Sequence, residues 1–271
     1  MKTAQSFFLF SSYYIIGDKM KVYSHRGESK YAPENTMSAY YLAYLVGSDG
    51  IETDLRKTKD DVLVLIHDKS VDRTSNYSGK VSDYTFDELL NMDFGDEYYK
   101  GEKIVKLTEF LKNFSERNVN IYIELKETGY EKLIVDTLKQ YSLKNVVLIS
   151  FKYNLLKKIR EMDNSIKLGW LIYDVNDSII KDCKNIKLNH VLCTAICLSK
   201  DEVTKLKNNN FIVSAWGVLG KSEIKRLKNI GVDRIIYDSG YDVKKFLKKE
   251  RKNVSFSCFN INRYRSCFTG R

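Results

Sequence analysis

Two of the three histidines in this 271-residue chain stand beside charged residues at the ends of apolar segments. His25 precedes Arg26, and His67 precedes Asp68. Between them lies Glu52-Thr53-Asp54, whose two carboxylates share one face if the segment is a strand. Imidazole titrates near neutral pH and can accept or donate a proton. Rare histidines near paired carboxylates predict metal-assisted acid–base chemistry on a phosphate ester.

Short β-branched segments alternate with helical patterns along most of the chain. The predicted strands are Val22 to Ser24, Gly50 to Leu55, Asn120 to Glu124, Val146 to Ser150, Lys167 to Ile172, His190 to Thr194, Phe211 to Ala215 and Arg234 to Tyr237. The predicted helices are Glu34 to Val46, Phe86 to Asn91, Leu107 to Arg117, Tyr130 to Tyr141, Asn154 to Met162, Asp177 to Lys184, Lys200 to Asn208, Lys221 to Ile230 and Asp242 to Arg251. The apolar segment Val62 to Ile66 follows Asp60-Asp61, which suits a hairpin turn.

Regular alternation of this kind predicts parallel strands covered by helices. With the hairpin strand set aside, the pattern favours an α/β fold of the (β/α)8 TIM barrel type over an open sheet. In such a barrel the active residues lie at the C-terminal ends of the strands. The chain contains one proline and no linker-like stretch, so we expect a single domain over residues 20–252, with an N-terminal extension (1–19) and a C-terminal tail (253–271).

Four separate segments therefore deliver ionisable side chains to one rim of the predicted barrel. These residues are His25, Arg26, Glu52, Asp54, His67, Glu124 and Lys126. Glu52, Asp54 and Glu124 offer only oxygen ligands, which suit Ca²⁺ or Mg²⁺ better than zinc. Arg26 can grip a phosphate through two N–H groups, and Lys126 can add a point charge. Which histidine acts as acid and which as base stays open.

Each of these residues taken alone is more often structural than functional. A third histidine, His190, begins a predicted strand without a carboxylate beside it, so we expect it to pack or to face solvent. His190, Cys193 and Cys197 lack a second ligand pair, which argues against zinc. The five cysteines form no disulfide pattern, and we expect them to be buried small apolar residues.

Bulk composition is that of a soluble globular protein, with a formal net charge of +10. Positive charge attracts anionic partners, but no nucleic-acid-binding motif accompanies it, and we expect no nucleic acid partner. The apolar stretch from Phe7 to Ile16 is too short to span a bilayer and lacks a cleavage site, so we expect a cytoplasmic location. Met20 is an alternative start.

Several short motifs, in matching order from about Met20 to Leu247, resemble the glycerophosphodiester phosphodiesterase family. They are His25-Arg26-Gly27, Pro33-Glu34-Asn35-Thr36, Glu52-Thr53-Asp54, His67-Asp68 with Arg73-Thr74, and Ile123-Glu124-Leu125-Lys126. Weaker matches are Ser150-Phe151, Ala215-Trp216-Gly217-Val218 and Gly231 to Asp238. The resemblance implies a (β/α)8 barrel with a small insertion after the second strand, at about residues 62–110.

The resemblance also implies roles for individual residues. His25 and His67 become the general acid and base, Glu52, Asp54 and Glu124 bind a divalent cation, and Arg26 and Lys126 contact phosphate. The implied reaction is hydrolysis of a glycerophosphodiester to sn-glycerol 3-phosphate and an alcohol. A route through a cyclic phosphate stays open, as does the oligomeric state.

Four further residues have supporting roles in this interpretation. Glu34 and Asn35 are expected to open a helix behind Pro33, and Asn35 to orient a ligand or a histidine; a plain helix start is the alternative. Trp216 and Phe151 are expected to form an aromatic wall beside the glycerol moiety, against a simple packing role.

Two other functions remain at this stage. Where the family often has Trp-Thr-Val-Asn, this chain has Trp216-Gly217-Val218-Leu219, which leaves the alcohol group open. The tail from Asn253 is basic and aromatic, which suggests a lysophospholipase D or another lipid phosphodiesterase with weak membrane contact. A non-catalytic phosphate-binding barrel is the third hypothesis.

Overall fold

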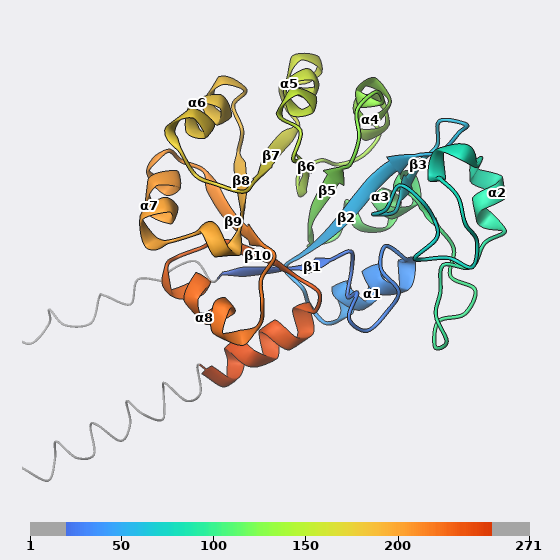
Figure 1. Cartoon of the computed structure of the whole chain (residues 1–271), viewed down its shortest axis with the longest axis horizontal. Coiled ribbons are helices and arrows are strands. Elements are labelled where there is room, and N and C mark those ends of the chain that lie inside the picture. The colour runs from blue at the N-terminus through green and yellow to red at the C-terminus, as the bar shows by residue number, and fades with distance from the viewer. Residues whose placement is uncertain (1–19, 251–271) are drawn as a thin grey trace, which may run out of the picture.

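The computed structural model describes residues 20–250, which form a closed barrel of parallel strands surrounded by helices (Figure 1). The barrel strands are β1 (Lys21–His25), β2 (Gly50–Lys57), β5 (Asn120–Leu125), β6 (Val146–Ser150), β7 (Lys167–Ile172), β8 (His190–Thr194), β9 (Ile212–Trp216) and β10 (Arg234–Tyr237). Their order is β1-β10-β9-β8-β7-β6-β5-β2, and a parallel β1–β2 pairing closes the ring. The predicted (β/α)8 barrel is confirmed.

Helices cover the outside of the barrel. They are α1 (Met37–Leu45), α3 (Leu107–Phe114), α4 (Glu131–Leu138), α5 (Tyr153–Met162), α6 (Asp177–Asn185), α7 (Lys200–Asn208) and α8 (Lys221–Asn229), and residues 240–250 are also helical. The strands are buried on both faces, as parallel strands under helices must be. Outward residues such as Ile51 and Leu148 pack on the helices, whereas Tyr23 and Leu192 fill the interior.

An insertion between β2 and α3 extends one side of the barrel (Figure 1). It contains β3 (Leu63–Leu65), a 3-10 turn η1 (Val81–Asp83), α2 (Phe86–Leu90) and β4 (Val105–Lys106), around a small apolar core of its own. The predicted hairpin is present, because β3 pairs antiparallel with the end of β2. Strand β4 was not predicted. Helix α3 begins at Leu107, within the range expected for the insertion, and packs on the barrel core.

The start of α1 differs from the prediction that Glu34 and Asn35 open the helix. The helix begins at Met37, and Thr36 is its N-cap, with its hydroxyl accepting a hydrogen bond from the Ala39 N–H. Asn35 has a φ of 57°, in the left-handed region, so it cannot be part of the helix. The two residues instead form a loop that carries their side chains toward the barrel mouth.

The third histidine lies at the opposite, N-terminal end of the barrel. His190 is buried, and its Nδ1 lies 2.9 Å from the Tyr122 hydroxyl and 3.3 Å from Arg234. The Tyr122 ring stacks on Tyr23 with centroids 4.5 Å apart. Burial, together with the charges of Arg234 and Lys167, lowers the pKa of His190 to about 3. His190 is therefore a neutral packing residue, one of the two roles expected for it.

Other predictions have mixed outcomes. Cys183 and Cys193 are buried as expected, but Cys197 is exposed because it lies in the 3-10 turn after β8. The N-terminal apolar stretch, Cys258, Cys267 and the tail from Asn253 lie outside the described residues. Within residues 20–250, no helix has the length and apolar character needed to cross a membrane.

Candidate active site

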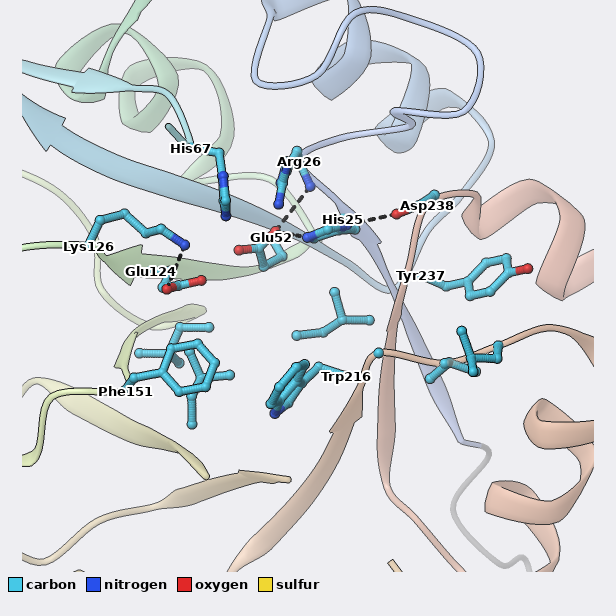
Figure 2. Close-up of a pocket in the computed structure, with 16 residues that line it drawn as sticks. His25, Arg26, Glu52, His67, Glu124, Lys126, Phe151, Trp216, Tyr237 and Asp238 are labelled. Carbon is cyan, nitrogen blue, oxygen red and sulfur yellow. Dashed lines mark hydrogen bonds and ion pairs between the residues drawn. The ribbon is translucent and has the colours of Figure 1, made fainter. Parts of the chain in front are cut away.

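A cavity of about 410 Å³ opens at the C-terminal ends of the barrel strands. Figure 2 shows that its two sides differ in chemistry. One side is ionisable and consists of His25, Arg26, Glu52, His67, Glu124, Lys126 and Asp238. The other side is largely apolar and includes Ile149, Phe151, Leu171, Trp216, Val218, Leu219 and Ile236. The predicted rim residues are thus brought together by four different segments of the chain.

Glu52, Asp54 and Glu124 form a compact acidic cluster. One carboxylate oxygen from each lies within 4.8 Å of the others, and no other such group of His, Cys, Asp or Glu occurs in residues 20–250. The register explains the geometry, because Asp54 on β2 pairs directly with Glu124 on β5. Asp54 Oδ1 is buried and accepts no hydrogen bond, although Lys126 Nζ lies 3.3 Å away. A buried oxygen free to coordinate, in an all-oxygen set, fits a hard divalent cation.

The cluster is electrostatically unfavourable without such a cation. Burial and the neighbouring Asp54 carboxylate raise the pKa of Glu52 to about 8. The same two causes raise the pKa of Glu124. Burial also acts to raise the pKa of Asp54, but the charges of Lys126 and Arg26 outweigh it and lower that pKa. Asp54 is therefore the member held ionised by the protein itself.

His25 is held between two carboxylates. Its Nδ1 lies 2.7 Å from Asp238 Oδ1, and its Nε2 lies 3.9 Å from Glu52 Oε2. Burial acts to lower the pKa of His25, but the hydrogen bond to Asp238 and the charge of Glu52 outweigh it and raise the pKa. With Nδ1 occupied, Nε2 is the nitrogen turned toward the acidic cluster. Asp238 stands directly after the last strand, and no catalytic role is predicted for it from the sequence.

His67 approaches the same cavity from the insertion. Its Nδ1 lies 2.6 Å from Asp68 Oδ1, and Arg73 Nε donates to the second Asp68 oxygen at 2.7 Å. That hydrogen bond from Arg73 lowers the pKa of Asp68. Each histidine therefore has its own carboxylate on Nδ1 and presents its other nitrogen toward the cavity (Figure 2). This is the arrangement that fixes an imidazole tautomer.

Arg26 and Lys126 lie against the cluster. Arg26 NH1 donates to Glu34 Oε1 at 2.9 Å, and Arg26 Nε lies 3.2 Å from Asp54 Oδ2 without a hydrogen bond of its own. Lys126 follows directly after β5, and its Nζ donates to Glu124 Oε1 at 2.8 Å, so the two side chains lie on the same side of the chain as predicted. Both cations line the cavity.

Glu34 and Asn35, the two residues after Pro33, support the site in different ways. Asn35 Nδ2 donates to Asp54 Oδ2 at 3.0 Å, while Asn35 Oδ1 accepts from the hydroxyls of Tyr40 and Thr53. Asn35 therefore orients a carboxylate of the cluster, and none of its hydrogen bonds reaches a histidine. Glu34 bridges Arg26 and Arg73.

The apolar side is built from aromatic rings in mutual contact. The Phe151 and Trp216 centroids lie 5.3 Å apart, and Tyr173 lies 5.2 Å from Phe151 and 5.3 Å from Trp216. Trp216 Nε1 donates to the Leu192 carbonyl at 3.2 Å, so its polar atom is already used. Rings this close pack on one another and form a continuous wall.

This chain matches the model of the glycerophosphoryl diester phosphodiesterase family over residues 25–240. The chain belongs to this family. The match begins at His25 and extends two residues past Asp238, so it contains the whole ionisable side of the cavity.

Curated relatives carry the same activity in their names. A glycerophosphodiester phosphodiesterase of Caldanaerobacter subterraneus subsp. tengcongensis is 33% identical over 238 residues, covering 81% of this chain and 94% of the relative. One from Bacillus altitudinis is 32% identical over 230 residues, covering 80% of this chain and 94% of the relative. These relatives place the chain among the enzymes of the glycerophosphodiester phosphodiesterase family.

Solved structures agree on the fold. An Oleispira antarctica phosphodiesterase superposes with a TM-score of 0.79 at 24% identity, covering 84% of this chain and 96% of the other. A glycerophosphodiester phosphodiesterase from Thermotoga maritima superposes with a TM-score of 0.71 at 26% identity, covering 84% of this chain and 98% of the other. The barrel is thus the architecture of the family.

Proposed function

We propose that this enzyme hydrolyses glycerophosphodiesters to sn-glycerol 3-phosphate and an alcohol, with a divalent cation and with His25 and His67 as its acid–base pair. The observation that carries the proposal is the placement of two carboxylate-bound imidazoles beside one acidic cluster in one cavity. The Oleispira antarctica structure similar to this chain was solved in complex with the product sn-glycerol 3-phosphate.

Glu52, Asp54 and Glu124 are the residues that would hold Ca²⁺ or Mg²⁺. Such a cation, when bound, neutralises the cluster and stabilises negative charge on a phosphoryl oxygen. Arg26 and Lys126 would bind the remaining phosphate oxygens, since both line the cavity and both carry N–H donors toward it.

The histidines divide the proton transfers. One imidazole accepts a proton from the attacking oxygen as this oxygen forms its bond to phosphorus. The attacking oxygen belongs to water or to a hydroxyl of the substrate; in the second case a cyclic phosphate forms, and water opens it in a further step to give sn-glycerol 3-phosphate. The phosphorus–oxygen bond to the alcohol then breaks, and the other imidazole, protonated beforehand, gives its proton to the leaving oxygen. Asp238 stabilises the protonated form of His25, and Asp68 orients the ring of His67 through its Nδ1.

The test is release of glycerol 3-phosphate from glycerophosphocholine with Mg²⁺ or Ca²⁺, and again after EDTA. We expect EDTA to abolish turnover, and His25→Ala and His67→Ala each to lower kcat about 100-fold or more. Exposed Lys69→Gln, close to the site but outside the cavity lining, is the matched control and should keep full activity. Turnover that survives EDTA, or full activity in either histidine variant, would refute the proposal.

An acylated substrate is the second candidate, because the apolar wall continues outward. Three successive loops, after β7, β8 and β9, expose Tyr173, Ile196 and Leu219 by 64%, 80% and 84%. Leu219 also lines the cavity, and Tyr173 stacks on Phe151. With the phosphate held at the ionisable side, a hydrocarbon chain on the glycerol would follow this surface and leave water.

The deacylated and the acylated substrate are distinguished by comparing kcat/KM on glycerophosphocholine with kcat/KM on a short-chain lysophosphatidylcholine below its micelle concentration. Leu219→Asn is expected to lower kcat/KM about tenfold for the acylated substrate only, since it removes about one buried aliphatic contact. Leu45→Asn is the control, because Leu45 is 76% exposed on α1, outside the cavity lining. Equal losses of kcat/KM on both substrates would exclude the acylated substrate.

A further inference from the structure

We propose that Arg73, contributed by the insertion, is a positioning residue that aims His67 and Arg26 at one phosphate through their carboxylate partners. This inference rests on the catalytic role proposed above for His67. Arg73 does not line the cavity. Its effect must therefore pass through the residues that it binds.

The first branch runs from Arg73 to His67. The Asp68 carboxylate is used on both oxygens, with His67 Nδ1 at 2.6 Å from one and Arg73 Nε at 2.7 Å from the other. A carboxylate anchored on one oxygen cannot rotate freely, so it fixes the direction of its other oxygen. Arg73 thereby sets the plane of the His67 ring.

The backbone of His67 is held independently of this branch. The His67 carbonyl accepts a hydrogen bond from Arg56 Nε at 2.9 Å, and Arg56 belongs to β2 of the barrel. Just before His67, β3 is paired along β2. The position of the His67 backbone is therefore given by the sheet, and Asp68 with Arg73 control only where its side chain points.

The second branch runs from Arg73 to Arg26. Arg73 NH1 and NH2 donate to the two oxygens of Glu34 at 2.7 and 2.8 Å, which is a bidentate pair. Glu34 Oε1 also accepts from Arg26 NH1 at 2.9 Å. Glu34 lies in the loop after β1, so Arg73 ties the insertion to the loop that carries the predicted phosphate-binding arginine.

Only arginine can make both branches at once. Its planar guanidinium offers Nε to Asp68 and the NH1–NH2 fork to Glu34, whereas lysine offers one ammonium group on a flexible stem. The side chain of Arg73 is 48% exposed, so water screens its ion pairs and weakens their contribution to folding stability. The three hydrogen bonds are thus better explained by orientation of the site than by support of the fold.

The test uses the full-length enzyme with saturating Mg²⁺ or Ca²⁺. Arg73→Gln is expected to lower kcat about 10- to 100-fold, the usual effect of losing a partner behind a site residue. Arg73→Lys should recover little of the loss, and both should melt within about 3 °C of the wild type. Lys69→Gln, an equal loss of charge four residues earlier, should keep wild-type kcat. Full activity of Arg73→Gln, wild-type kcat in Arg73→Lys, or an equal loss in Lys69→Gln would overturn the proposal.

A double-variant cycle tests the route of the effect. In the His67→Ala background, Arg73→Gln should lower the residual rate by a clearly smaller factor than in the wild type. The reason is that Arg73 and Asp68 then have no imidazole ring left to orient. The same factor in both backgrounds would contradict positioning through His67. Absence of any wild-type turnover, or full activity of His67→Ala, would refute the proposed function instead, so the two failures are distinct.

Discussion

His25 Nδ1 lies 2.7 Å from Asp238 Oδ1, although 213 positions separate the two residues in the chain. The contact joins the first and last strands of the barrel, which pair in parallel through Ser24 and Tyr237. Closure of the barrel therefore places a carboxylate behind a histidine, as Asp68 does locally for His67.

Replacement of Asp238 by Asn should shift the titration of His25 to lower pH. Burial already disfavours the imidazolium, and the hydrogen bond to Asp238 is a main cause that raises the pKa of His25. Its loss should therefore lower that pKa and reduce kcat/KM about tenfold near neutral pH. The pH profile of kcat/KM, or the NMR titration of His25, measures the shift. Asp242→Asn, which breaks an ion pair with Lys30, is the control and should leave the profile unchanged.

The metal-free enzyme should lose stability as pH rises from about 4.5 toward 8. The pKa of Glu52 is raised to about 8 in the folded chain, so the folded state holds a proton that the unfolded state has released. That contribution is complete below the unfolded pKa and disappears as pH rises through the folded pKa. Melting temperatures with and without Mg²⁺ should therefore diverge with increasing pH. A metal effect independent of pH, or one unchanged in Glu52→Gln, would argue against a cation at this cluster.

Asn35→Asp should weaken metal binding about 10- to 100-fold. The new carboxylate keeps an acceptor for Tyr40 and Thr53 but cannot donate to Asp54, and the repulsion between the two carboxylates turns Asp54 away from its position in the cluster. Aspartate also tolerates the left-handed backbone found at this position. Isothermal titration with Mg²⁺ or Ca²⁺ measures the change. Thr36→Ser, which keeps the helix cap, is the control. Equal metal affinities in the wild type, Asn35→Asp and Thr36→Ser would disprove the role of Asn35 in orienting Asp54.

His190→Ala should affect stability and leave the acid–base profile intact. The Tyr122 hydroxyl keeps Ser214 Oγ and Arg234 NH1 as partners, so the loss of its hydrogen bond with His190 costs about 1 kcal/mol of unfolding free energy. Because the pKa of His190 is lowered to about 3, its contribution is present above the unfolded pKa near 6.5 and is lost as pH falls toward 3. The variant should therefore show a weaker loss of stability in acid, measured by urea unfolding. A shifted pH profile of kcat/KM would contradict this purely structural role.

Much of the barrel was predictable because it follows local rules. Each strand is a short β-branched segment, each helix has its own apolar stripe, and residues at strand ends share one rim. Errors occurred where tertiary contacts override local signals. Asn35 has the residue type of a helix start. Its side chain, however, donates a hydrogen bond to Asp54 and its backbone is left-handed, so the helix begins only after it. Strand β4 is two residues long and exists only through its pairing with β3.

Residue type and spacing two apart on a strand are local properties, so the chemical groups of the site and the strand ends that carry them are readable from the chain. The partners of these groups depend on the closed fold. Asp238 reaches His25 because the ring closes, and Arg73 reaches Glu34 because the insertion folds back over the first loop. Hydrogen bonds between distant segments form only when the strand register and the side-chain rotamers are both right. Neither property produces a periodic pattern in the sequence.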